Sequence, residues 1–290
     1  MQSSVLACNR EQIREIQDLP SLPVIAEKIL LEIGKEYADI AQLSSVIEQD
    51  PGLLARIIGV ANSAYYGCPD KIYTVSDAII KVLGLNTVKC LALGIVLSSP
   101  LCVIKCPGFR LDKYWATTMY TANLARQLAP YIGLKGVDLN DHAYLCGLLH
   151  SLGLLVLVHS FPSEMSSVFR KADFNDTEGY CQLQRDAIGM TYAEAGAILA
   201  QRWHLPHEVV GVIEHHMDAD YRGEYWELSA LTGLSVNLVT HGYVGGEWDE
   251  VSDRYISALQ IESDLIQKVS EKVYATKPEM TGMAKILSLD

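Results

Sequence analysis

The side chains best suited to chemistry in this sequence are histidines within or beside apolar helical segments. His150 and Ser151 lie at the centre of the apolar segment 143–159, and His215 and His216 end another apolar run. A neutral imidazole binds transition metals, and a bound metal can generate hydroxide from water near neutral pH. Such a site also needs carboxylates to offset the charge of the cation. The residue after His150 is a serine, which supplies no carboxylate.

The remaining histidines form only a weak metal site. Adjacent residues of a helix point about 100° apart, so His215 and His216 cannot easily serve one ion together. Three interpretations of His150 stay open: a buried histidine with satisfied hydrogen bonds, a metal ligand, or a contact to a small ligand. The sequence has no Walker loop, no dinucleotide fingerprint and no G-x-S-x-G elbow.

The segments that must position these residues are helical throughout. Asp39 is predicted to cap the helix 40–48, and Asp50, followed by proline, is predicted to cap a helix that closes at Gly67. The segment 143–159 is apolar on every side, which predicts one helix buried almost all round. Strand alternation never persists, so the predicted fold class is all-α.

Further helices follow from apolar periodicity and capping residues. They are expected at 24–34, 78–83, 87–97, 111–131, 163–171, 178–188, 191–203, 207–217, 228–243 and 252–275. Asn86 is predicted to cap the helix 87–97, and Asn62 to bond backbone groups beyond its own helix. The segment 98–108 contains two prolines and two cysteines. It is predicted to be a hinge between two helical halves.

Composition limits the function of the chain. Its 290 residues carry a net charge of −12 and no run of Lys and Arg, which argues against nucleic-acid binding. The seven cysteines form no CxxC pair, so free thiols in a reducing cytosol are expected. The N-terminal residues do not resemble a signal peptide, and 143–159 is too short for a comfortable membrane span. A cytoplasmic protein without membrane contact is therefore expected.

Five stretches, taken in order, carry a family resemblance. They are LPSLPVIAEKIL, VIEQDPGLLARIIGVANSAYYG, TVSDAIIKVLGLNTVKCLALG, YLCGLLHSLGLLVL and AGAILAQRWHLPHEVVGVIEHH. Together they resemble the HDOD domain, a family of bacterial signal-output modules. The resemblance implies a fold similar to that of HD-domain phosphohydrolases, usually without their catalytic residues.

This resemblance also implies a domain organisation. Residues 1–18 are an N-terminal helical extension, and 19–217 are the HDOD domain. Within that domain the resemblance implies an N-terminal helical subdomain 19–97, the hinge 98–108 and an HD-like bundle 109–217. Residues 218–290 are expected to be C-terminal helices that complete the bundle.

An HD-type hydrolase holds its metal through an early histidine, a His-Asp pair, further histidines and a late aspartate. By resemblance, the matching positions in this sequence are Thr117 or Thr118, then His150 with Ser151, Tyr192, His215 with His216, and Asn237. Three imidazoles remain at these positions and no carboxylate does. The resemblance therefore implies a degenerate site with no catalytic residue, no metal and no cofactor.

Two functions from different classes are compatible with this sequence. The favoured one is a non-catalytic signalling module that binds a protein partner, in a pathway of the kind that the family links to cyclic-di-GMP turnover. The alternative is a divergent metal-dependent phosphohydrolase acting on a nucleotide or cyclic dinucleotide. It would have to recruit another carboxylate, and Glu214 is the nearest in sequence to the histidines. The oligomeric state is left open.

An aromatic segment after the second capped helix is the candidate partner surface. It contains Tyr65, Tyr66 and Tyr73, and it is expected near the groove between the two halves. Aromatic residues are enriched among the residues that dominate interface energetics. They also commonly pack beneath their own loop, and the sequence leaves both interpretations open.

Overall fold

The computed structural model describes residues 19–35, 39–101, 106–132, 139–174, 176–241 and 250–289. In these ranges every regular element is a helix, which confirms the all-α class. The first helices are α2 (Val24–Ile33), α3 (Ile40–Glu48), α4 (Pro51–Ala61), α5 (Val75–Asp77), the π-helix η1 (Ala78–Leu83), α6 (Leu85–Ser98) and the 3₁₀ turn η2 (Ser99–Leu101). They are followed by α7 (Leu111–Leu128), the 3₁₀ turn η3 (Ala129–Tyr131), α8 (Leu139–Leu149), α9 (Leu152–Ser160), α10 (Pro162–Lys171), α11 (Thr177–Ile188), α12 (Tyr192–Arg202), α13 (His207–His215), α14 (Trp226–Thr240), α15 (Glu250–Leu259), α16 (Ser263–Tyr274) and α17 (Lys277–Leu287).

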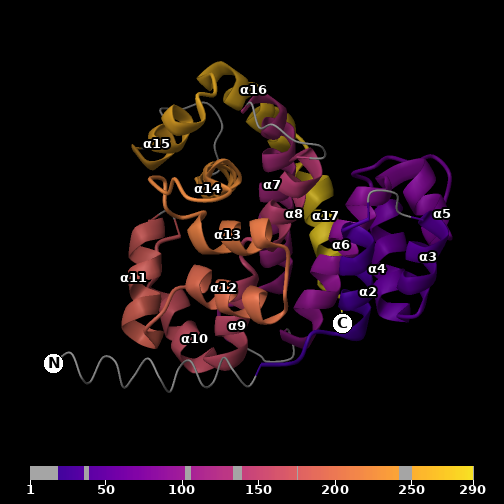
Figure 1. Cartoon of the computed structure of the whole chain (residues 1–290), viewed down its shortest axis with the longest axis horizontal. Helices are drawn as coiled ribbons and strands as arrows, with labels where there is room; N and C mark the ends of the chain where they lie inside the picture. Colours follow the sequence, from indigo (N-terminus) through magenta and orange to yellow (C-terminus); the bar gives the residue numbers. More distant parts are fainter. Residues whose placement is uncertain are drawn as a thin grey trace.

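The helices form two groups that share a boundary (Figure 1). Helices α2 to α6 lie on one side, and the helices from α7 onward lie on the other. Helix α7 is central to the second group, because it packs against α8, α14, α16 and α17. The predicted extension 1–18 and residues 102–105 of the predicted hinge lie outside the described residues.

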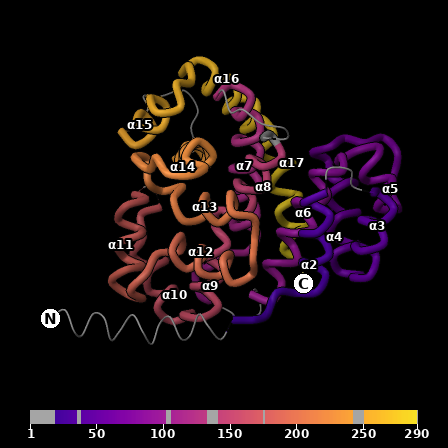
Figure 2. Tube along the Cα trace, in the orientation of Figure 1, coloured from indigo at the N-terminus to yellow at the C-terminus, as the bar shows by residue number. Residues whose placement is uncertain are grey.

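Contacts between distant parts of the chain hold the two groups together. The last helix, α17, runs along the boundary and packs against both α7 and α4 (Figure 2). Helix α6 packs against α8 as well as against α2. The indole nitrogen of Trp203 donates a hydrogen bond of 3.1 Å to the carbonyl of Pro20, which is 183 positions away in sequence.

Both predicted aspartate caps are confirmed. The Asp39 carboxylate accepts from the backbone N–H of Ala41, and Asp50 accepts from those of Gly52 and Leu53 at 2.9 and 3.0 Å. These bonds satisfy N–H groups that lack a partner within the first turn of a helix.

The helix that Asp50 caps ends earlier than predicted, at Ala61 rather than near Gly67. The reason is Asn62, whose side-chain amide bonds both the backbone carbonyl and the backbone N–H of Ile72, at 2.8 and 2.9 Å. This pair of bonds ties the chain after the helix to a segment ten residues further on. Asn62 thus bonds backbone groups as predicted.

The prediction that Asn86 caps a helix is wrong. Helix α6 begins earlier, at Leu85, and its N-cap position is Gly84, with φ of 78°. That angle lies in the left-handed region that glycine adopts readily. Asn86 instead donates a side-chain hydrogen bond to the carboxylate of Asp141 at the start of α8.

The predicted single helix over 143–159 is also wrong, because the chain turns at His150 and Ser151 between α8 and α9. The turn accompanies very close packing of α9 on α12. A Cβ atom at Gly153 would lie 1.8 Å from the carbonyl oxygen of Tyr192 and 2.3 Å from the backbone nitrogen of Gly196. Backbones this close leave no room for a side chain, and this contact, which is not local in sequence, redirects the helix.

This helix pair is the most apolar part of the described chain. The segment Asp141–Ser160 is long and apolar enough, by length and composition alone, to cross a membrane. In the fold, 83% of its apolar window is buried inside the protein. This burial is what is expected of a core helix of a globular domain.

Candidate functional site

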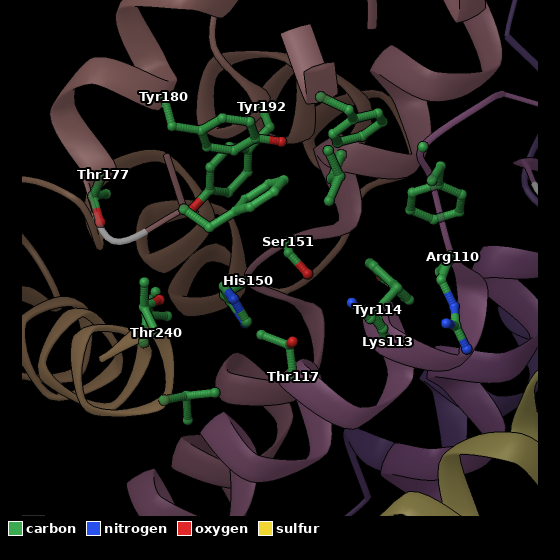
Figure 3. A pocket seen from close by; sticks show the side chains of 17 residues that line it. Arg110, Lys113, Tyr114, Thr117, His150, Ser151, Thr177, Tyr180, Tyr192 and Thr240 are labelled. Atoms are coloured by element: carbon green, nitrogen blue, oxygen red, sulfur yellow. The ribbon is translucent and has the colours of Figure 1, made fainter. Parts of the chain in front are cut away.

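A cavity of about 420 Å³ opens between the first turns of α7 and α9, the helices α11 and α12, and the end of α14 (Figure 3). Aromatic rings form most of its wall, and they come from Phe109, Tyr114, Phe169, Phe174, Tyr180 and Tyr192. Aliphatic hydroxyl groups line it from Thr117, Ser151, Thr177 and Thr240. Arg110 and Lys113 supply the only charged side chains among its described lining residues.

Two buried histidines meet beside this cavity: His150 lines its inner end, and His216, which is not among the lining residues, packs against His150. His150 is 2% exposed and His216 is fully buried, with ring centroids 5.3 Å apart. The Nδ1 of His150 lies 2.7 Å from the carbonyl oxygen of Gly147. A carbonyl only accepts, so Nδ1 carries the proton and Nε2 of the neutral ring is an acceptor. His216 is held in the same way, with Nδ1 at 3.0 Å from two carbonyl oxygens of α13.

Tyr192 forms a hydrogen bond with the unprotonated ring nitrogen of His216. The tyrosine hydroxyl lies 3.1 Å from Nε2 of His216 and donates to it, because that nitrogen has no proton of its own. Tyr192 is the first residue of α12, where Thr191 and Glu194 form a capping box. Its backbone N–H donates to the side chain of Gln184 at 2.8 Å. The sequence-predicted ligand position is therefore occupied by a firmly positioned phenol.

The three side chains are uncharged near neutral pH. Burial, with a smaller contribution from the neighbouring His216, lowers the pKa of His150 to about 3 against the opposing effect of the hydrogen bond to Gly147. Burial also lowers the pKa of His216 to about 4. Burial raises the pKa of Tyr192 well above its usual range, so the phenol keeps its proton. The inner end of the cavity is polar but carries no charge.

Ser151 replaces the expected aspartate and makes no compensating contact. Its side chain is among the cavity lining, its residue is only 7% exposed, and its Oγ has no hydrogen-bond partner within the described parts of the chain. A buried hydroxyl without a partner costs about 1–3 kcal/mol of desolvation. Of the two candidate positions for the early histidine, Thr117 lines the cavity. Thr118 is buried and donates to the carbonyl of Trp115 at 3.1 Å.

The structure does not bring two other predicted positions into the cavity. His215 points away from His216 and stacks on Tyr221, with ring centroids 3.8 Å apart. Asn237 donates to Ser252 at 2.9 Å and is not among the cavity lining. Helix α14 lines the cavity instead through Val236, Val239 and Thr240.

A replacement carboxylate is not found at the histidines. Glu214 is 44% exposed and lies 3.8 Å from the outward-facing His215. Within the described ranges, no group of three or more His, Cys, Asp or Glu side chains is arranged to hold a metal ion. The metal that HD-type hydrolases use therefore does not fit the residues present at this site.

Sequence reasoning missed the aromatic wall and the two cations of the cavity. Phe109 stacks on Phe169 with centroids 6.2 Å apart, although sixty residues separate them in sequence. No motif marks such residues, because they come together only when α10 packs against α11 and the ring of Phe109 stacks on Phe169. The one sequence signal for this wall is the occurrence of aromatic residues within 109–114 and 169–180.

The three tyrosines of the candidate partner surface do not form one patch. The hydroxyl of Tyr65 donates to Asn123 of α7 at 3.3 Å, and its ring meets that of Tyr66 edge-on at 4.9 Å. Burial raises the pKa of Tyr66 to about 12. Tyr73, in contrast, is 72% exposed. Two tyrosines thus pack at the boundary between the helix groups, and one faces solvent.

The class of protein follows from this helical fold together with a sequence comparison. A sequence model of the HDOD domain matches residues 19–219. This is well over half of the chain, and the chain belongs to the HDOD domain family.

Among curated proteins, the chain is similar to an uncharacterized protein of Treponema pallidum (strain Nichols). The two are 25% identical over 252 residues, which is 86% of this chain and 47% of the relative. The chain therefore spans about half the length of that relative.

Solved structures share the fold. A protein from Marinobacter aquaeolei VT8, named provisionally for signal transduction, matches with a TM-score of 0.82 and 26% identity, over 98% of this chain and 66% of that one. A protein from Shewanella amazonensis SB2B, named provisionally as a phosphohydrolase, matches with a TM-score of 0.74 and 25% identity, over 96% and 98%. An HDOD domain protein of unknown function from Geobacter sulfurreducens matches with a TM-score of 0.76 at 21% identity, over the full length of both chains, and shows the fold alone.

Proposed function

We propose that this chain is a signal-transduction module that acts by binding a protein partner and does not hydrolyse phosphoesters. The family and the similarity to a protein provisionally assigned to signal transduction support the first part. One observation carries the second part. The hydroxyl of Tyr192 occupies the nitrogen of His216 that a metal would need, at 3.1 Å.

The cost of admitting a metal supports this proposal. A cation bound by His150 and His216 would have two imidazole ligands and no carboxylate from the described lining of the cavity. It would also displace the Tyr192 hydroxyl and leave a buried phenol without a partner, at a cost of about 1–3 kcal/mol. Uncompensated charge in a buried site is more expensive still.

The proposed partner is a protein, and the proposed location is the cytoplasm. Tyr73 is the candidate contact, because it is the solvent-facing member of the three tyrosines. The cytoplasmic location is supported by the cysteines, since Cys68, Cys90, Cys106, Cys146 and Cys181 are all free thiols.

The test combines metal analysis with hydrolysis assays on three purified proteins: the wild type, Ser151→Asp, and Ser151→Asp with Tyr192→His. With manganese, iron or zinc added, the wild type is expected to hold no stoichiometric metal and to cleave neither linear nor cyclic nucleotides. Ser151→Asp alone is expected to bind no metal and to lose stability, because Tyr192 still blocks His216 and the new carboxylate is buried. Metal binding is expected only in the double variant, which supplies two more ligands.

Two results would contradict the proposal. The first is turnover by the wild type that disappears in His150→Ala. The second is tight metal binding by Ser151→Asp alone with a gain in stability, because it would show that the site lacks only one residue. His207→Ala, at an exposed histidine on α13, is the matched control for the loss of an imidazole.

A further inference from the structure

The cavity has an inner end with unused hydrogen-bonding capacity. Ser151 Oγ is buried, lines the cavity and has no partner in the described structure. Beside it, His150 donates through Nδ1 to Gly147, which leaves Nε2 as an acceptor only. Figure 3 shows the two side chains close to each other and apart from Arg110. A ligand that presents a hydrogen-bond donor at this end would satisfy Nε2 of His150 or the Ser151 hydroxyl, which can also accept.

The outer end of the cavity carries one net positive charge. Arg110 is the N-cap residue of α7 and pairs with Asp112 at 2.6 Å. Lys113, one turn into the helix, is exposed and forms no ion pair with any described residue. At the start of α7 the Asp112 carboxylate also accepts from the backbone N–H groups of Asp112 and Lys113, so Lys113 supplies the positive charge left for an anion. This local charge is notable in a chain whose net charge is −12.

Between these ends the wall is a set of flat, apolar surfaces. The ring of Phe169 stacks on Phe109 with planes 27° apart, and it also contacts Phe174 with centroids 6.4 Å apart. Tyr180 continues the series, with its ring 5.5 Å from that of Phe174. Such a wall suits a planar aromatic body, because rings gain energy by offset stacking and edge contacts.

We propose that this cavity binds a small aromatic monocarboxylate that carries a hydroxyl or N–H group at the end opposite its acid. The carboxylate would lie at Lys113 and the start of α7, and the donor would lie at Ser151 and His150. The volume of about 420 Å³ is within the range of small-molecule sites, about 300–1,000 Å³. One net positive charge matches a monoanion better than a doubly charged phosphate monoester. This inference adds a ligand to the proposed signalling role and does not depend on the protein partner.

The test is isothermal titration of the full chain with three matched probes. The first is a hydroxynaphthoate, with the acid and the hydroxyl on opposite rings; the second is naphthoate, and the third is naphthol. We expect one-to-one binding of the hydroxynaphthoate, with affinity about tenfold above that of either truncated probe, since each lost polar contact corresponds to about 1.4 kcal/mol. Added salt should weaken binding of the two carboxylates and leave naphthol unchanged.

Two variants separate the two ends of the cavity. Ser151→Ala is expected to weaken binding of the hydroxynaphthoate about tenfold and to leave the affinity for naphthoate unchanged. Lys113→Gln is expected to weaken binding of both carboxylates about fivefold and to leave the affinity for naphthol unchanged. Lys285→Gln removes an equal charge from an exposed position on α17 and should change none of the three affinities.

Three results would overturn the inference. They are equal affinities for naphthol and the hydroxynaphthoate, probe affinities that neither variant changes, and tighter binding of a nucleoside monophosphate than of any carboxylate. Each of these concerns the cavity alone. None of these results would change the outcome of a hydrolysis assay or a partner-capture experiment. Failure of the ligand inference is therefore distinct from failure of the proposed function.

Discussion

At position 192 a phenol stands where a metal-binding imidazole is expected, and it pairs with the buried His216. By donating to Nε2 of His216, Tyr192 satisfies a buried acceptor with a buried donor. Each group removes the desolvation cost of the other. The pair needs no counter-charge, which explains how the site tolerates a serine in place of the bridging aspartate.

The buried neutral histidines predict a loss of stability in mild acid. An unfolded histidine has a pKa of about 6.5, whereas burial lowers the pKa of His150 to about 3 and that of His216 to about 4 in the fold. Between these values and about 6.5 the unfolded chain binds protons that the folded chain does not, so the free energy of unfolding falls as pH decreases. Each histidine contributes up to about 1.4 kcal/mol per pH unit, and nothing above about pH 7.

Denaturant unfolding between about pH 5 and 6.5 measures this slope, in a window where exposed carboxylates stay mostly ionised. His150→Gln should show a shallower slope than the wild type. His207→Gln, which alters an exposed histidine, should match the wild-type slope. Equal slopes for the wild type and His150→Gln would mean that His150 is protonated as readily in the fold as outside it.

Among the elements, the contact of α9 with α12 positions the whole site. It brings the turn at Ser151 to the first residue of α12, Tyr192, and it depends on Gly153. In Gly153→Ala the new methyl group would meet the carbonyl oxygen of Tyr192, so the helices must separate. We expect a loss of stability of about 3 kcal/mol or more, since a clash with backbone has no inexpensive relief.

The same substitution of glycine by alanine elsewhere in the chain should raise the stability of the protein instead of lowering it. Gly282 lies in the middle of α17, and a Cβ atom there would have nothing within 4 Å. Gly282→Ala should stabilise the protein by about 0.5–1 kcal/mol through helix propensity. Thermal and denaturant unfolding of the two variants provide the comparison. A Gly153→Ala variant as stable as the wild type would show that α9 and α12 are not in backbone contact.

The sequence predicts a feature well when the residues that cause it are close together in the chain, and poorly when they are far apart. The cap at Asp50 was predictable, because the carboxylate bonds groups two and three residues away. The turn at His150 was not, because it is set by a contact with α12, forty residues on. Tyr192 was predictable as a replaced ligand position, and His216 was predictable as one of a retained pair of histidines. Their hydrogen bond was not, because it requires the packing of α12 against α13.

At the scale of the molecule, the two helix groups meet through polar contacts as well as through apolar ones. Arg126 of α7 donates to Thr87 of α6 at 3.2 Å, and its guanidinium lies over the ring of Tyr144 in α8. Tyr65 donates to Asn123 across the same boundary. The boundary is therefore ordered by specific bonds, and a change in the relative position of the groups would have to break them.

These contacts separate the roles of the candidate partner tyrosines. Tyr73→Ala should weaken partner capture from lysate by about thirtyfold in affinity, which corresponds to about 2 kcal/mol at a dominant interface residue. Its thermal midpoint should stay unchanged, because the ring is 72% exposed. Tyr66→Ala should lower the thermal midpoint by several degrees, because its ring is largely buried.

Tyr131→Ala is the matched control, since this tyrosine is 54% exposed and lies in η3, the turn that follows α7. It should change neither the captured proteins nor the thermal midpoint. If Tyr73→Ala captures the same proteins as the wild type, the partner surface lies elsewhere on the molecule.

The packing of α17 on α4 has a consequence for the order of events during synthesis. Helices α2 to α6 are made first, yet the face of α4 at Gly59 packs against Ile286 of α17. Trp203 bonds Pro20 across 183 positions in the same way. Closing loops of this length is slow relative to forming single helices. A nascent chain halted before residue 277 would therefore expose this face of α4 to chaperones, and only the arrival of the last helix would end that exposure.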